Sequence, residues 1–292
     1  KIMKNRLRKH VEKLCSIDRY YGNPDGIHDA REYIKSELKK IILEVENLCE
    51  LKMGVVHYMA GGTIQQNVFF KLNSSFPELV VIGAHYDAVK GSPGADDNAS
   101  AVAGLIETIR EIVKNPPDFG IEFVFYSTEE PPFFLGKEMG SYVHAKGLNK
   151  EKKILGALVY EMIGFFSDEE NSQQPVPMID IPTIGNFIGS LGWEDSEEIN
   201  KALRRGFIEI NQIPLIGVSN NLLATEFALS DHISYHNFKI PTVMITDTSF
   251  LRNPNYHEPS DTPDTLNYEK MSHVIKGVVN SMQYFRRNHF KH

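Results

Sequence analysis

Acidic and histidine side chains gather where apolar runs of the sequence end. These side chains are His85, Asp87, Asp96, Asp97, Glu129, Glu130, Glu161 and His257. The first of them closes the run ELVVIGAH (78–85), which is typical of a strand buried on both faces. Imidazole and carboxylate groups together suit zinc, and they also suit cobalt and manganese. A bound metal ion is therefore the simplest explanation for so many polar groups beside buried strands.

Five of these residues are candidate metal ligands: His85, Asp97, Glu130, Glu161 and His257. One catalytic zinc ion takes about three protein ligands plus water. Five ligands fit two ions if one carboxylate bridges them. Such paired ions, about 3.5–4 Å apart, hold an attacking water and a substrate oxygen together. The number of ligands therefore predicts two zinc ions in each chain.

Two further acids have different predicted roles, both catalytic. Asp87 lies two residues after His85 on the same side of an extended strand end. It is therefore placed to accept the other imidazole N–H and to fix the tautomer. Glu129 precedes the candidate ligand Glu130, and adjacent carboxylates seldom bind the same ion. We predict that Glu129 is the general base that takes a proton from water.

Each of these residues also has a structural explanation when it is taken alone. A single histidine at a strand end is more often a hydrogen-bonded structural residue, and GADDNAS (94–100) also fits an Asx-rich turn before a helix. TEE (128–130) and His257 also fit solvated loops. The joint occurrence of these groups at successive strand ends favours the metal site.

Strands and helices alternate along the chain. The predicted strands are 51–59, 65–72, 78–85, 121–127, 154–160, 214–218 and 240–246. The predicted helices are 26–44, 99–113 with Asn98 as its cap, 137–147, 195–210, 230–237 and 267–288. This alternation predicts an α/β fold of three layers, α/β/α, around a mostly parallel, mixed central sheet. Ligands of such sheets bind beyond the carboxyl ends of the strands, where the acids and histidines lie.

The composition is that of a soluble globular protein and limits the kinds of partner. The 292 residues are 41% hydrophobic and carry a net charge of −7. This charge argues against nucleic acid and anionic membranes as partners, and no apolar run reaches the length of a membrane span. We predict one domain over residues 1–292, with a long loop at about 165–193 that covers the site. Cys15 and Cys49 are predicted to be free thiols, with a single disulfide between them as the alternative.

Six sequence motifs together resemble the co-catalytic zinc aminopeptidases of the bacterial leucyl aminopeptidase type. They are GAHYDAV (83–89), PGADDNAS (93–100), YSTEE (126–130), VYEMIGF (159–165), ALSDHISYHNFKIPTVMITD (228–247) and NYHEPSDTPDTL (255–266). They occur in the family's order, and the resemblance covers roughly residues 60–290. Glutamate carboxypeptidases and glutaminyl cyclases are relatives of this family.

The resemblance implies a role for each residue and an exopeptidase mechanism. His85, Asp97 and Glu161 would hold one zinc, and Glu130, His257 and the bridging Asp97 would hold the other. A metal-bound hydroxide would attack the first peptide carbonyl of a substrate with a free N-terminus. Glu129 would serve as general base and pass the proton to the leaving amine. The family also carries a cis peptide bond after the bridging Asp, which is Asp97–Asn98 in this chain.

The sequence departs from the family pattern at three positions. Glu161 stands where the aminopeptidases usually have the shorter Asp, and Ala101 stands where they usually have Gly. Phe227 replaces a Tyr that supplies an oxyanion donor, and Tyr256 is one candidate to substitute for it. Asp231 and His232 fit either a pocket-wall role or a capped short helix. Four aromatic residues near the strand ends fit either an apolar pocket or the core: Phe133, Phe134, Phe165 and Phe166.

Two other functions remain as alternatives. One is a glutaminyl cyclase-like acyltransferase with a single zinc, and the other is a non-catalytic binding domain on the same fold. His85 argues against the cyclase, and retention of Glu129 with five ligands argues against the binding domain. Because family members are often exported, a periplasmic or extracellular location is expected, with the cytoplasm as the alternative. Side-chain preference, oligomeric state and the choice between aminopeptidase and dipeptidase are left open.

Overall fold

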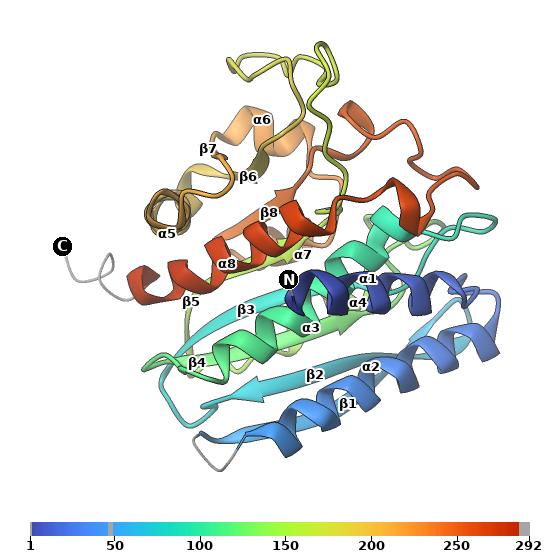
Figure 1. Cartoon of the computed structure of the whole chain (residues 1–292). Helices are drawn as coiled ribbons and strands as arrows, with labels where there is room; N and C mark the ends of the chain where they lie inside the picture. Colours follow the sequence, from blue (N-terminus) through green and yellow to red (C-terminus); the bar gives the residue numbers. More distant parts are fainter. Residues whose placement is uncertain (1, 46–48, 286–292) are drawn as a thin grey trace.

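A twisted mixed sheet runs through the middle of the molecule, with helices on both of its faces (Figure 1). The computed structural model describes residues 2–45 and 49–285. Within these ranges the strand order is β1-β2-β4-β3-β5-β8-β6-β7. The strands are β1 (Leu51–Ala60), β2 (Thr63–Leu72), β3 (Glu78–His85), β4 (Gly120–Tyr126), β5 (Lys153–Tyr160), β6 (Ile188–Gly192), β7 (Leu215–Ser219) and β8 (Thr242–Thr246).

The central strands run parallel, and the outer ones make the sheet mixed. Strand β3 pairs in parallel with β4 and β5, and β5 pairs in parallel with β8. The β1–β2 hairpin joins the sheet antiparallel through β2 and β4, while β6 runs antiparallel to β8. The carboxyl ends of β3, β4, β5 and β8 therefore meet at one edge, as the sequence predicts.

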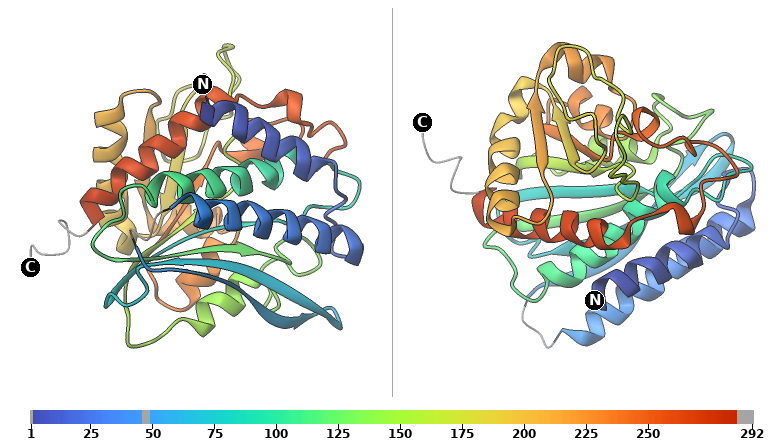
Figure 2. Two further views of the ribbon diagram at one scale, coloured as in Figure 1. Left: turned by 60° about the horizontal axis from the view of Figure 1, so that its bottom comes forward. Right: turned by 45° about the horizontal axis from the view of Figure 1, so that its top comes forward.

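Alternate residues of the buried strands enter two different cores. From β3, Val80 and Ile82 pack into the larger core, while Leu79 and Val81 pack into the smaller one. The larger core lies under α1 (Ile2–Cys15), α2 (Pro24–Glu44), α3 (Ala101–Ile112), α5 (Glu197–Ile210) and α8 (Tyr268–Phe285). The smaller core lies under α4 (Gly140–Gly147) and α7 (His232–Asn237), on the opposite face (Figure 2, left). The predicted three-layer α/β/α fold is therefore confirmed.

Two α-helices and one strand of the described chain are absent from the predicted set. The first is α1, which packs against α3 and α8. The second is β6, which lies inside the segment 165–193 that we predicted to be a loop throughout. The third is α6 (Asn221–Glu226), whose N-cap Asn220 accepts a hydrogen bond from the Leu223 amide.

The predicted cap of the helix after the acidic motif is wrong. Ser100 is the residue before α3, and Asn98 faces β5 instead. The Asn98 side chain donates to the Tyr160 carbonyl oxygen and accepts from the Met162 amide. It therefore ties the acidic segment to the end of β5. The Asp97–Asn98 peptide bond is cis, as the family resemblance implies.

Three further predictions concern the C-terminal helix, the two cysteines and membrane-spanning helices. Helix α8 is described as far as Phe285, and the predicted continuation to residue 288 lies outside the described residues. Cys15 and Cys49 are both free thiols, as predicted. In the described ranges no helix combines the length and apolar character needed to cross a membrane.

Candidate metal centre and its pocket

The strand ends bring the predicted ligands together around His85. This residue ends β3, Glu129 follows β4, and Glu161 follows β5 directly. The His85 Nε2 atom lies 3.4 Å from a carboxylate oxygen of Glu161, 3.4 Å from one of Asp97 and 3.5 Å from one of Glu129. Since β3, β4 and β5 are parallel neighbours, this clustering follows from the sheet itself.

Asp97 lies between the two histidines. Its Oδ1 atom faces His85, and its Oδ2 atom lies 3.0 Å from the Nε2 atom of His257. The same His257 nitrogen lies 3.4 Å from Glu130 Oε2. Asp97 therefore offers one oxygen toward each histidine, which is the arrangement that a bridging ligand requires.

Several ligand atoms at this centre lack any other partner. His85 Nε2, Asp97 Oδ1 and Glu130 Oε1 are buried and, among the described residues, have no hydrogen-bond partner. Two groups of side chains offer ligand atoms that lie within 4.8 Å of one another: His85, Glu129 and Glu161, and His85, Asp97 and Glu130. Buried polar atoms without partners are costly, so the donor set fits a bound cation. The division of ligands between two zinc ions stays a prediction, because these groups differ from the expected ones.

Burial and repulsion between carboxylates oppose the ionisation of three acids of this centre, Glu129, Glu130 and Glu161. Burial raises the pKa of Glu129 and of Glu161, and burial together with the Asp97 charge raises the pKa of Glu130 to about 8. The pKa of Asp97 is lowered despite its burial, because His257 and His85 both favour its ionised form. The pKa of His257 is raised to about 10: burial would lower it, but the contacts with Asp97 and Glu130 outweigh burial.

Asp87 contacts three other residues of the centre: His85, Glu129 and Glu130. Its carboxylate is buried and lies 3.3 Å from His85 Nδ1. One carboxylate oxygen accepts from the Glu129 amide at 3.2 Å, and the other accepts from the Glu130 amide at 3.0 Å. The hydrogen-bond partner of His85 Nδ1 is the backbone carbonyl oxygen of Asp87, at 3.1 Å, whereas the sequence predicts the carboxylate as the acceptor. The contacts with the two amides were not predicted.

Asp261, to which no role was assigned from the sequence, repeats this arrangement at the neighbouring loop. Its two carboxylate oxygens accept from the amides of Asp96 and Asp97, at 2.9 and 3.1 Å. The Asp96 side chain in turn accepts from the Gly164 amide and from Asn253. The signal was the Asp four residues after His257, inside a motif whose other members we assigned.

Ser230 contacts the centre directly, and its two neighbours Asp231 and His232 are buried with it. The Ser230 hydroxyl donates a hydrogen bond to Glu161 Oε2, which gives the longer side chain a fixed position. Asp231 is fully buried, and its oxygens have no hydrogen-bond partner among the described residues. Burial raises the pKa of Asp231 to about 7 and lowers the pKa of His232 to about 3. The ring of His232 packs against Trp193 rather than entering the ligand set.

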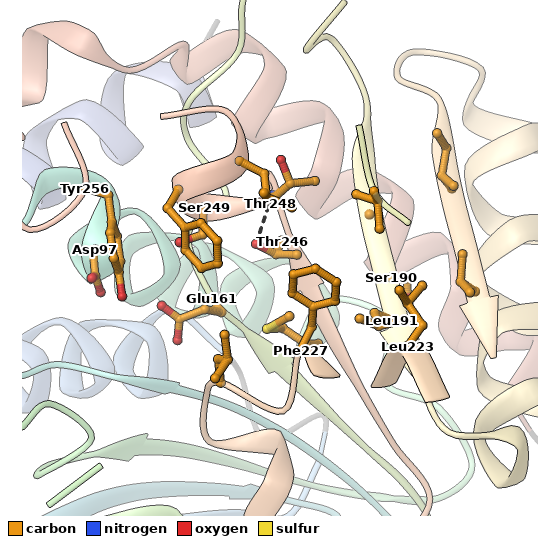
Figure 3. A pocket seen from close by; sticks show the side chains of 18 of the residues that line it. Asp97, Glu161, Ser190, Leu191, Leu223, Phe227, Thr246, Thr248, Ser249 and Tyr256 are labelled. Atoms are coloured by element: carbon orange, nitrogen blue, oxygen red, sulfur yellow. Dashed lines mark hydrogen bonds between the residues drawn. The ribbon is translucent and has the colours of Figure 1, made fainter. Parts of the chain in front are cut away.

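A cavity of about 180 Å³ opens beside the ligands. Figure 3 shows the carboxylates of Asp97 and Glu161 at one end, and Leu191 and Leu223 at the other. Most of the lining is apolar and comes from β6, β7, β8, α6 and the loops beside them. The lining includes no Lys or Arg among the described residues. The cavity therefore combines an acidic end with a long apolar remainder.

Of the four aromatic residues predicted to line a pocket or the core, one lines the cavity. It is Phe134. Phe133 packs on Tyr21 with ring centroids 4.8 Å apart, and Phe166 belongs to the larger core. Phe165 is not among the lining residues either.

Tyr256 lines the acidic end of the cavity. Its ring stacks on His257, with centroids 3.8 Å apart, and lies beside Asp97 (Figure 3). Burial and then the charges of Asp97 and Glu161 raise its pKa, so the phenol keeps its proton. Phe227 lines the middle of the same cavity and has no hydroxyl. Tyr256 is thus a phenol donor at the ligand end.

Sequence comparisons identify one family and several relatives. The model described as Peptidase family M28 matches residues 67–282. The chain is 39% identical over 212 residues to the uncharacterized protein YfbL of Escherichia coli K12, covering 69% of this chain and 65% of that protein. It is 24% identical over 296 residues to a probable leucine aminopeptidase of Arthroderma otae, covering 96% of this chain and 72% of that protein.

Two solved structures share the fold at low sequence identity. The LapA aminopeptidase of Legionella pneumophila matches with a TM-score of 0.74 at 20% identity, covering 96% of this chain and 70% of that one. A glutaminyl cyclase of Bacteroides thetaiotaomicron matches with a TM-score of 0.68 at 17% identity, covering 96% and 97%. At such identities the likeness concerns the fold alone, and this fold hosts two different chemistries.

Proposed function

From the premise that the chain belongs to peptidase family M28, we propose that it is a zinc-dependent aminopeptidase that removes apolar residues from peptide N-termini. One observation carries the proposal: a single cavity has the metal-ligand acids at one end and apolar side chains along the rest. A substrate whose first carbonyl lies at the acidic end would extend its first side chain into the apolar part. Burial of that side chain would favour large apolar residues.

The charges of the cavity favour an N-terminal over a C-terminal substrate group. The acids at its ligand end are Asp97, Glu129, Glu130 and Glu161. They would attract the ammonium group of a free N-terminus. A free C-terminal carboxylate would need a cationic partner, and the described lining offers no Lys or Arg. This contrast supports an aminopeptidase over a carboxypeptidase.

The residues of this chain would hold two zinc ions in the way the family resemblance implies. His85 and Glu161 would bind one ion, Glu130 and His257 the other, and Asp97 both. Zinc, when bound, would supply Lewis acidity and a water molecule of lowered pKa. Asp87 would keep His85 in the required orientation, and Ser230 would do the same for Glu161.

Glu129 would move the proton of the reaction. Its amide is held by Asp87, and its carboxylate lies in the ligand group without being needed as one of the five ligands. Burial raises its pKa, which makes it a stronger base than an exposed glutamate. It would take the proton of the attacking water and pass it to the nitrogen of the leaving amine.

Tyr256 would replace the missing tyrosine at position 227. Its phenol stays protonated and lies at the ligand end of the cavity. A donor at this place would stabilise the negative charge that develops on the carbonyl oxygen in the transition state.

A glutaminyl cyclase remains the second candidate, because a structure of that activity shares the fold. An N-terminal glutamine would place its polar amide in the part of the cavity that is apolar. Such burial without a hydrogen-bond partner is unfavourable, which supports the peptidase.

The test combines metal content with hydrolysis of aminoacyl-p-nitroanilides. We expect two zinc ions per chain, cleavage of leucyl and phenylalanyl substrates that a chelator abolishes, and loss of cleavage in Glu129→Ala with zinc retained. One zinc ion, with ring closure of N-terminal glutamine peptides instead, would favour the cyclase. No zinc after loading would contradict both enzymes and leave the non-catalytic binding domain.

A further inference from the structure

The outer wall of the cavity is formed by residues 174–182, which we call the flap. Val176, Ile179 and Ile181 of the flap line the cavity. The flap belongs to the long connection between β5 and β6, which crosses the top of the sheet near α6 (Figures 1 and 2). No hydrogen bond joins residues 175–182 to another segment of the described chain. The position of the flap is therefore set at its base.

Gln173 forms that base. Its side chain is 4% exposed, and its Oε1 atom accepts from Arg252 Nε at 2.8 Å and from the Thr248 hydroxyl at 3.1 Å. The backbone amide of Gln173 donates to the Thr183 carbonyl oxygen at 3.0 Å, and this bond joins the two ends of the flap. The next amide, of Gln174, donates to the Leu251 carbonyl at 2.9 Å. These bonds fasten one end of the flap to the segment after β8.

Arg252 is the fixed point to which Gln173 is attached. It is 5% exposed, and its Nη1 atom donates to the carbonyl oxygens of Phe187 and Phe165. Its guanidinium also lies 4.5 Å from the centre of the Phe187 ring. Because it bonds to residues on both sides of the flap, Arg252 holds the whole connection against the segment after β8.

We propose that Gln173 is a specificity-determining residue that acts through the flap. It does not line the cavity; it positions Val176, Ile179 and Ile181 against the first side chain of the substrate. Large apolar side chains reach the flap, and alanine does not. This inference rests on the proposed aminopeptidase function, and it assigns to Gln173 an effect on which substrates that enzyme prefers.

The test compares Gln173→Ala with Gln174→Ala in the zinc-loaded full chain. Both variants lose the same side-chain amide, but Gln174 is exposed and is no lining residue, so it is the matched control. For Gln173→Ala we expect KM to rise about tenfold with leucyl- and phenylalanyl-p-nitroanilide, because apolar contact in the pocket is loosened. We expect kcat, the pH profile and the alanyl substrate to be unchanged. Gln173→Glu keeps an acceptor for Arg252 and is expected to restore the low KM.

Equal losses on alanyl and leucyl substrates, or no loss on either, would overturn the inference. A wild-type chain that cleaves none of the substrates would instead contradict the proposed function. In that case, hydrogen exchange of a peptide covering residues 170–182 still decides the role of Gln173. We expect at least about tenfold faster exchange at the Gln174 amide in Gln173→Ala than in wild type. Unchanged exchange would refute the anchoring.

Discussion

Two buried carboxylates, Asp87 and Asp261, each bind the backbone of a dipeptide that carries a predicted metal ligand. Asp87 accepts from the amides of Glu129 and Glu130, and Asp261 accepts from those of Asp96 and Asp97. Each carboxylate uses both oxygens, so it fixes the direction of two consecutive peptide units. The candidate metal centre is therefore held in position by the same kind of contact in two loops.

We predict that Asp261→Asn weakens zinc binding. The amide side chain accepts from one backbone N–H but presents an NH₂ group to the other, so the loop that carries Asp97 must shift. A loss of about 10- to 100-fold in zinc affinity is expected, as for other groups that orient metal ligands. Competition with a chromophoric chelator measures it. Asp264→Asn, in the same loop but with an 84% exposed side chain, is the control and should bind zinc like wild type.

We predict that Tyr256→Phe lowers kcat by about 10²-fold and leaves KM and zinc content nearly unchanged, because an oxyanion donor acts mainly in the transition state. Steady-state kinetics with leucyl-p-nitroanilide measures the effect. Tyr142→Phe, on α4 and outside the cavity lining, serves as control. An unchanged kcat in Tyr256→Phe would show that the phenol takes no part in the reaction.

The predicted ligands could be located by their place at strand ends, but residues that hold those ligands or their backbone in position were not predicted. Asp261 and Ser230 bind a backbone amide pair and a ligand oxygen, and neither lies directly after a predicted strand. Their partners are 69 or more positions away in the chain. Contacts over such separations depend on how the loops fold together, which local pattern does not reveal.

At the scale of elements, α1 fastens the N-terminal part of the chain to the sheet. Leu7, Val11 and Leu14 enter the larger core, and Arg6 and His10 both reach Glu107 on α3. The spacing of its apolar residues is helical, so the sequence held a signal for this helix that we did not use. The five-residue strand β6, with two glycines, carries almost no sequence signal for a strand. It is extended because it pairs with β7 and β8.

We predict that Glu107 makes stability depend on pH below about 5. Burial opposes its ionisation, but His10 and Arg6 outweigh burial and lower its pKa from 4.5 to about 2. The ionised form is therefore favoured by folding. The resulting stabilisation, on the order of 3 kcal/mol, is fully present above pH 4.5 and is lost as pH falls toward 2.

The measurement is denaturant unfolding of wild type and Glu107→Gln between pH 7 and pH 2.5. The difference in unfolding free energy should be largest above pH 5 and should shrink as the solution is acidified. Glu111→Gln, which removes a more exposed partner of Arg6, should change stability by less than about 1 kcal/mol. A difference between wild type and Glu107→Gln that does not vary with pH would contradict the assignment.

For the whole molecule, the metal centre is where strands β3, β4 and β5 and the segment after β8 meet. Four buried acids repel one another there, and a divalent cation would offset that repulsion. We predict that zinc raises Tm by about 5 °C or more over the chelated protein, since an ion at 100 times its Kd adds about 2.7 kcal/mol.

Differential scanning calorimetry with chelator, zinc or magnesium tests this prediction. Magnesium prefers an oxygen-only octahedral site and should give a smaller shift than zinc. His85→Ala should reduce the zinc shift, because it removes the histidine at the centre of the ligand group. Equal Tm values in zinc and in chelator would contradict a metal-stabilised fold.

The expected export of the protein stays a prediction from the family resemblance.

The two ends of the cavity are formed by different segments of the sequence. The acids at one end lie between residues 97 and 161, while the apolar remainder is built largely from residues 176–229. The acids proposed for catalysis and the apolar residues proposed to select the substrate therefore lie in separate segments of the sequence. Exchanging the second stretch between relatives is a route to new specificities in which the machinery that cuts the bond is inherited intact.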